Sequence, residues 1–195
     1  MKHKNIGVKR TPLHSRKINV QGYLREDGLW DVEAVLADTK GYDIELFDRG
    51  RIPAGEGFLH YMTLMLTVDS TLMIRDAQAV MAETPYKDCS AAGLQYKKLI
   101  GIRIQSGWMN EAKRALGRST SCTHLTELLP VLATAAIQTI NGYQLFYSKQ
   151  ERSASEKDRK INSCHGFRKG SRAQQYFWPS ESDGQRDDFR VPKNR

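Results

Sequence analysis

The chain has 195 residues, enough for one well-buried domain with appendages, and 39% of them are hydrophobic, as in an ordinary soluble fold. No stretch approaches the roughly 18 apolar residues that cross a bilayer, and the N-terminus lacks the apolar segment of a signal peptide, so we expect a cytoplasmic protein. Three cysteines, an odd number, do not make a secreted disulfide framework, and we expect reduced thiols.

The formal net charge of +8 is distributed unevenly along the chain. Residues 1–17 carry six Lys or Arg and no acidic residue, and residues 148–195 carry twelve basic and seven acidic side chains. Residues 18–147 have a net charge of −3. We therefore expect a basic arm over 1–17, a single α+β domain over 18–147, and a polar tail over 148–195 that is partly disordered or wrapped on the domain. Nucleic-acid binding is not expected, because the basic residues lie at the ends and no zinc-finger spacing or RNA motif accompanies them.

The front half of the chain shows the alternation of apolar and polar residues that is typical of β-strands. It predicts four strands, over residues 18–24, 30–36, 58–68 and 72–81. Asp27-Gly28 and Asp69-Ser70 supply turns between them, and residues 42–47 predict a short edge strand before a Gly- and Pro-containing loop over 49–57. The sequence therefore predicts an antiparallel meander.

The next part of the chain has helix signals. Apolar spacing and capping residues predict three helices, over residues 89–100, 107–116 and about 123–140. Asp88 is the expected N-cap and Gly101 the expected C-cap of the first, and Ser121 or Thr123 is expected to cap the third, which Pro130 should kink or divide. We expect all three helices to pack on one face of the meander.

Two cysteines stand where helices are predicted to begin. The partial positive charge at a helix N-terminus lowers the pKa of a thiol, and the thiolate is the form that binds metal or attacks a substrate. Thiolates combined with histidine nitrogens are typical ligands of zinc and related metals. The predicted metal ligands are His60, Cys89, Cys122 and His124, with Cys164 and His165 as further candidates.

Packing alone is an alternative explanation for each of these residues. Free cysteine is among the most buried residue types, and a histidine on an apolar strand face, such as His60, is often a hydrogen-bonded core residue. His124 stands in a first turn, where a side chain can help to cap its helix. We expect the three tryptophans to serve only packing: Trp30, Trp108 and Trp178.

Several motifs give the chain a family resemblance over roughly residues 10–180. They are His14-Ser-Arg, the run from Gly22 to Ala34, Asp38-Thr-Lys, Pro85-Tyr-Lys-Asp-Cys, Gly107-Trp, Cys122-Thr-His-Leu-Thr-Glu-Leu and Cys164-His165. With these motifs the chain resembles an uncharacterised bacterial domain-of-unknown-function family, a resemblance that implies no established activity.

From Leu64 to Ala136 the order of elements is also similar to the NifU-like scaffold on which iron–sulfur clusters are assembled. That resemblance implies an antiparallel sheet against helices with one exposed site, Cys89 matching the scaffold's first helix cysteine, and Cys122 with His124 matching its later His-Cys pair in changed order and spacing. The scaffold's cysteine and aspartate at the start of the long strand are absent, and His60 is the coordinating side chain nearest that place. This ligand set would suit zinc or mononuclear iron as well as an iron–sulfur cluster.

The sequence leaves three functions open. The first is a transition-metal or iron–sulfur accessory protein or carrier that transfers its cargo to a protein client. The second is an enzyme, in which a metal activates water or Cys89 or Cys122 acts as a nucleophile, with Asp88 or Glu127 as orienting carboxylate. The third is a non-catalytic interaction protein. Metal identity, client and oligomeric state are not determined by the sequence.

Overall fold

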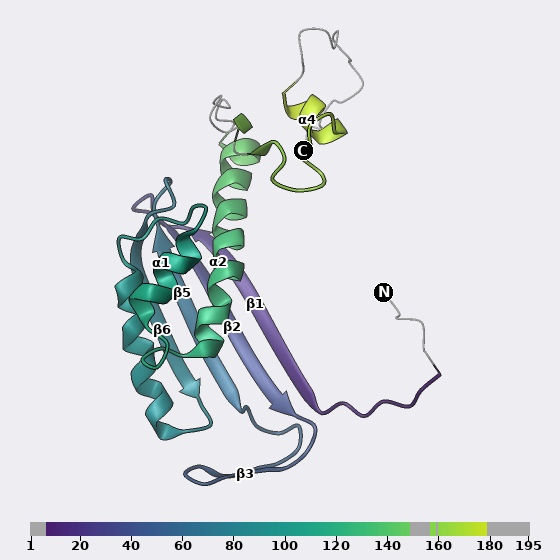
Figure 1. Ribbon diagram of the computed structural model, residues 1–195, viewed down its shortest axis with the longest axis vertical. Helices are drawn as coiled ribbons and strands as arrows, with labels where there is room; N and C mark the ends of the chain where they lie inside the picture. The colour runs from purple at the N-terminus through teal and green to yellow at the C-terminus, as the bar shows by residue number, and fades with distance from the viewer. Residues whose placement is uncertain (1–6, 149–156, 159, 179–195) are drawn as a thin grey trace. The chain divides into compact units, whose positions relative to one another are not determined.

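The computed structural model describes residues 7–148, 157–158 and 160–178. Four long strands form an antiparallel sheet in the order β1-β2-β5-β6 (Figure 1). Their bounds are His14–Leu24 for β1, Trp30–Lys40 for β2, His60–Val68 for β5 and Ile74–Glu83 for β6. The predicted meander is confirmed, including the first hairpin turn, where Gly28 has a φ of +80° that favours glycine.

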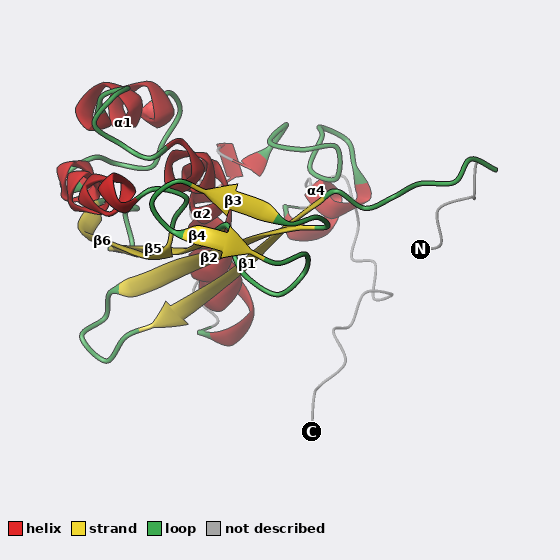
Figure 2. Cartoon of the chain, turned by 90° about the horizontal axis from the view of Figure 1, so that it is seen from below, coloured by secondary structure: helices red, strands yellow, loops and turns green. Residues whose placement is uncertain are grey.

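A separate two-stranded ribbon interrupts the meander between β2 and β5 (Figure 2). It pairs β3, Ile44–Leu46, with β4, Gly50–Ile52. The expected short strand within 42–47 is confirmed as β3, but its expected place at the edge of the meander is wrong, and the expected loop over 49–57 begins with β4. A tight turn, in which Arg49 N donates to Leu46 O, folds the segment back on itself instead of along the sheet.

One face of the four-stranded sheet packs against helices, and its inward side chains form the core. These side chains come from alternate positions, as the period of a strand requires, and include Val32, Ala34 and Leu36 of β2 and Met62, Leu64 and Leu66 of β5. Two helical segments pack on this face, η1, Lys87–Leu99, and α2, Thr123–Gly142, and α1, Trp108–Leu116, packs against both of them (Figure 1). Trp30 and Trp108 are buried in this core, as expected.

The first helical segment differs from its prediction in type and in caps. It is a 3₁₀-helix that begins at Lys87, with Tyr86 as N-cap and Ile100 as C-cap in place of Asp88 and Gly101. The start of the segment has a partner that is remote in sequence. Asp48, in the turn of the β3–β4 ribbon, accepts a hydrogen bond of 2.9 Å from the Lys87 backbone N–H, as an acidic group at a helix N-terminus can.

The third helix is continuous, and Cys122 is its N-cap rather than Ser121 or Thr123. Of the two expected effects of Pro130, division of the helix is wrong, because buried leucines before and after the proline hold both halves against the sheet, and a kink stays a prediction. The helix passes very close to β1 at Gly22, where an added Cβ would collide with the Thr139 side chain. Glycine at this position therefore lets α2 approach the sheet.

The chain divides into two compact units, residues 1–143 and 144–195. In the first, β1 begins at His14, inside the segment expected to be a basic arm. The second contains α4, Arg172–Phe177, whose N-cap Ser171 accepts from Gln174 N. Much of the expected tail, residues 149–156, 159 and 179–195, lies outside the described residues. Within the described part of the chain, no helix is long and apolar enough to cross a membrane.

Candidate metal centre

Three neighbouring strands place three polar side chains in one row on the helix-covered face. In the strand register Arg16 of β1 lies opposite Asp38 of β2, and Asp38 lies opposite His60 of β5. Asp38 continues the inward positions of its strand beyond Leu36, and His60 precedes the inward Met62. We call Arg16, Asp38 and His60 the ionic row.

The ionic row is joined by hydrogen bonds that run from the partly exposed Arg16 to the buried Asp38 and His60. Arg16 donates from Nε and Nη2 to the two oxygens of Asp38, both at 2.8 Å, and His60 Nδ1 lies 3.0 Å from Asp38 Oδ2. Asp38 is 1% exposed and His60 6% exposed. Because an ionised carboxylate only accepts, His60 Nδ1 carries the hydrogen and donates it, which leaves Nε2 with a free lone pair.

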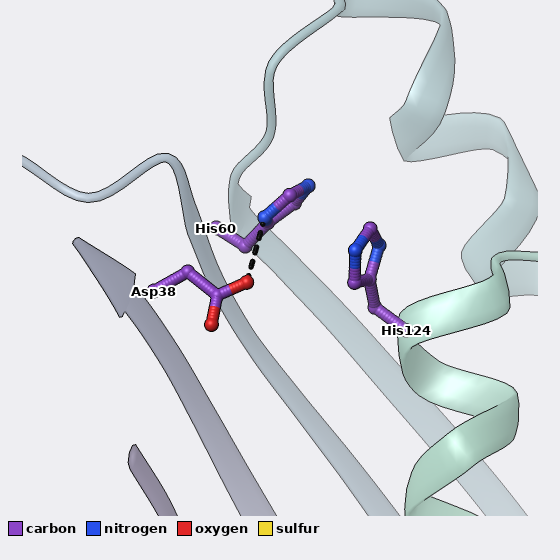
Figure 3. Close-up of side chains that lie close together, drawn as sticks. All are labelled: Asp38, His60 and His124. Atoms are coloured by element: carbon purple, nitrogen blue, oxygen red, sulfur yellow. Dashed lines mark hydrogen bonds and ion pairs between the residues drawn. The ribbon is translucent and has the colours of Figure 1, made fainter. Parts of the chain in front are cut away.

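The start of α2 brings a second histidine to the row. The ring centroids of His60 and His124 are 4.0 Å apart, and one ring nitrogen of His124 faces His60 (Figure 3). One ligand atom from each of Asp38, His60 and His124 can be chosen so that all three lie within 4.8 Å of one another. We call His60 and His124 the histidine pair.

Two contacts fix the position of the α2 start. The hydroxyl of Tyr96, a buried residue of η1, donates to the backbone oxygen of Cys122 at 2.7 Å and lies 2.8 Å from Thr126 Oγ1. On the other side, Arg16 Nη1 donates to Glu127 at 3.1 Å. Helix, 3₁₀-helix and sheet together therefore position His124.

Burial keeps both histidines neutral near neutral pH. Burial, followed by the neighbouring His124, lowers the pKa of His60 to about 4. Burial, followed by the positive charge of Arg16, also lowers the pKa of His124. Burial opposes ionisation of Asp38, but the hydrogen bonds and charge of Arg16 hold the pKa of its carboxyl below the ordinary value. Two neutral imidazoles beside an ionised carboxylate are in the protonation state that metal binding requires.

Cys122 lies beside the histidine pair, with its Sγ 3.9 Å from His124 Nδ1. It is half-buried and packs against the hydrophobic core. Burial raises the pKa of its thiol, and the backbone N–H groups of Leu125 and His124 do not offset that effect. The expectation that a helix start lowers the pKa of this thiol is therefore wrong.

The other predicted ligands lie outside the group. Cys89 is half-buried in the first turn of η1, and neither it nor Cys122 is part of the metal-competent group found among the described residues. Cys164 is exposed in the second unit, where Arg168 lies 3.3 Å from the Nε2 of the adjacent His165. The structure thus brings His60 and His124 together and places Cys122 next to them.

Sequence reasoning missed Asp38 and Arg16. Asp38 carried a readable signal, since it occupies the inward position two residues after Leu36 in a strand whose inward residues are otherwise apolar. Arg16 carried no such signal in the sequence, because it belonged to a basic segment. Its partner, Asp38, is determined by the register of β1 and β2.

The group is a candidate site for a metal ion. Zinc lies about 2.0–2.1 Å from histidine nitrogens, so two of its ligand atoms are roughly 3.4 Å apart in a tetrahedral site. The ligand atoms of Asp38, His60 and His124 lie within 4.8 Å of one another, which is somewhat wider than the separation of two ligand atoms on a bound zinc ion.

Comparison with known proteins gives a family without a function. A family model described as "Protein of unknown function (DUF2889)" matches residues 14–138, a range that contains the ionic row and the histidine pair. Comparisons with curated proteins and with solved structures found no match, so the expected likeness to iron–sulfur scaffolds has no support from them. Since the match spans more than half of the chain, the protein belongs to this family of proteins of unknown function.

Proposed function

We propose that the protein binds one transition-metal ion between His60 and His124 and acts as a metal-binding accessory or carrier protein. The observation that supports this most strongly is the approach of the histidine pair, whose ring centroids are 4.0 Å apart and which belongs to a group of ligand atoms, with Asp38, that lie within 4.8 Å of one another. Both imidazoles have lowered pKa values, so metal need not compete with protons for them near neutral pH.

The neighbouring groups favour a single ion over a cluster. Imidazole nitrogens suit zinc, copper, nickel and iron. Within the described residues the metal-competent group contains no thiol, and Cys122 contacts His124 from beside it, whereas iron–sulfur clusters are held mainly by several thiolates. Cys122 is a third ligand of the proposed site once the metal displaces its proton.

Partial exposure supports a carrier role. His60 is buried, but His124 and Cys122 are only half-buried at the start of α2. An ion bound there would be reachable from one side, as transfer to a protein client requires.

Metal content tests the proposal. Protein purified anaerobically is analysed for metals and acid-labile sulfide, and the metal-free protein is titrated with zinc. We expect one ion per chain, its loss in His60→Ala and His124→Ala, weaker binding in Cys122→Ser, and full binding in the matched controls His165→Ala and Cys164→Ser. Zinc binding that is unchanged in both histidine variants would overturn the proposal, and stoichiometric acid-labile sulfide would replace it with a cluster.

A cysteine-dependent enzyme is a second candidate, favoured by the 3.9 Å approach of Cys122 Sγ to His124 Nδ1. In that function His124 accepts the thiol proton as Cys122 attacks its substrate. Alkylation by iodoacetamide, read by mass spectrometry, separates the two functions. A nucleophilic Cys122 reacts fast near neutral pH with or without chelator, whereas a metal-held Cys122 is protected until chelator is added.

A further inference from the structure

We infer that Asp38 is a positioning residue and not a metal ligand, and that Arg16 occupies its oxygens so that the site accepts nitrogen-preferring transition metals and rejects Mg²⁺ and Ca²⁺. This inference rests on the proposed metal site, whose ion class and geometry it specifies.

Both oxygens of Asp38 are already engaged. Arg16 binds them with two parallel hydrogen bonds of 2.8 Å, an arrangement that matches the planar guanidinium to the carboxylate. The Nε2 of His14 lies 3.7 Å from Oδ1 as an additional neighbour. Oδ2 accepts from both Arg16 and His60, so a metal ion there would have to displace a hydrogen bond, and an ion on Oδ1 would lie next to the positive charge of Arg16.

The remaining hydrogen bond of Asp38 sets the orientation of His60. Because Nδ1 donates to Oδ2 at 3.0 Å, Nε2 is the nitrogen left to bind an ion. A carboxylate that holds a ligating histidine in this way is a recurring outer partner of metal sites, and its loss weakens metal binding about 10- to 100-fold. The strand register fixes Asp38 between its two partners, so the orientation is built into the sheet.

The engagement of Asp38 determines which ions fit. Mg²⁺ and Ca²⁺ require several oxygen ligands, up to eight for Ca²⁺. The carboxylate of Glu127 in α2, which also contacts Arg16, is 60% exposed and is held by that pairing. The ligands left for an ion are the imidazole nitrogens of the histidine pair and the sulfur of Cys122, and these atoms bind borderline and soft metals.

The orientation of His60 can be read in the metal-free wild-type protein. Nitrogen-15 NMR of the histidine side chains reports which ring nitrogen carries the hydrogen. We expect the hydrogen of His60 on Nδ1 and a bare Nε2. The opposite tautomer would overturn the inference, and this measurement needs no variant to fold.

The visible spectrum of bound cobalt(II) then tests whether Asp38 is a metal ligand or a positioning residue. We expect Asp38→Asn to keep one cobalt and the wild-type visible spectrum while binding about 10- to 100-fold more weakly. Asp31→Asn, on the opposite face of the same strand, is the matched control and should bind like wild type. A changed spectrum or complete loss of cobalt in a folded Asp38→Asn protein would show that Asp38 is a ligand.

Competition tests the ion class. We expect a hundredfold excess of Mg²⁺ or Ca²⁺ over Co²⁺ to leave the wild-type cobalt spectrum unchanged, and displacement of cobalt would overturn this part of the inference. Failure of the wild-type protein to bind cobalt or zinc would instead defeat the proposed function, while the tautomer of His60 would still test the role of Asp38.

Discussion

The two ends of the helix-covered sheet face are built on the same strands in opposite ways. Over most of its length, residues such as Leu36 and Leu64 are fully buried and apolar. At the end where β2 stops and β5 begins, the same inward positions carry Asp38 and His60. Apolar burial stabilises a fold, whereas burying an ion pair costs desolvation energy that its attraction often fails to recover. The end of the sheet that carries Asp38 and His60, which we call the ionic end, is therefore better explained by ligand binding than by a contribution to the stability of the fold.

The largest expected effect comes from unpairing Asp38. Arg16→Ala leaves a buried carboxylate without its main partner, and we expect the free energy of unfolding to fall by about 3–5 kcal/mol in urea titrations near neutral pH. Arg25→Ala, at the other end of β1, is the matched control, because Arg25 pairs with Asp27 and Asp31 closer to solvent. Equal losses of unfolding free energy in Arg16→Ala and Arg25→Ala would contradict the view that the Arg16 pair differs from an ion pair closer to solvent.

Truncation in the apolar region should affect stability alone. Leu64→Ala opens a cavity at a fully buried site and should lower the free energy of unfolding by about 2–5 kcal/mol. Zinc affinity, measured by calorimetry on the folded protein, should stay within twofold of wild type. A large loss of zinc affinity in this variant would mean that the two regions are not independent.

Acid should weaken the ionic end through His60. Its pKa is about 4 in the folded protein against about 6.5 when unfolded, so the unfolded chain binds more protons as pH falls between these values. The free energy of unfolding should therefore drop by about 3 kcal/mol from His60 between pH 6.5 and 4. The lowered pKa of His124 acts in the same direction, and the carboxylate contribution of Asp38 is lost only at still lower pH.

Urea titrations across this range give the measurement. His60→Gln should show a shallower decline than wild type, because its side chain has no proton to take up. An equally steep decline in the variant would assign the acid sensitivity to other groups.

The smallest change in stability should follow replacement of the whole ionic row. Combining Arg16→Met, Asp38→Leu and His60→Leu removes the buried carboxylate together with its two partners, and exchanges of this kind are often neutral or stabilising by about 1–4 kcal/mol. Thermal and urea unfolding should show a protein about as stable as wild type that no longer binds zinc. Severe destabilisation would show that the row is needed for folding.

Local patterns predicted most of the fold because alternation and turn residues act over short distances. They identified the hairpin around Gly28 and the long strand that ends at Val68. The short strand β3 was predicted, but its partner β4 was missed because a three-residue strand carries no readable period. The helix start at Lys87 was misplaced, and the carboxylate of Asp48 that accepts from its backbone N–H is remote in sequence.

The candidate site was predictable in part for a similar reason. His60 and His124 stand out locally, one on an apolar strand face and one at a helix start. Arg16 and Asp38 gain their meaning only from the register of three strands. The position of Cys122 at a helix start did not reveal that burial raises the pKa of its thiol. Nor did the position of Cys89 reveal that this residue lies outside the metal-competent group.

Anomalous diffraction at the zinc absorption edge, from crystals of the zinc-loaded protein, tests the central claim most directly. The histidine pair predicts one strong peak about 2.0–2.1 Å from a ring nitrogen of both His60 and His124, with Asp38 still bound to Arg16. No peak between the two histidines, or a peak only at Cys89 or Cys164, would contradict it.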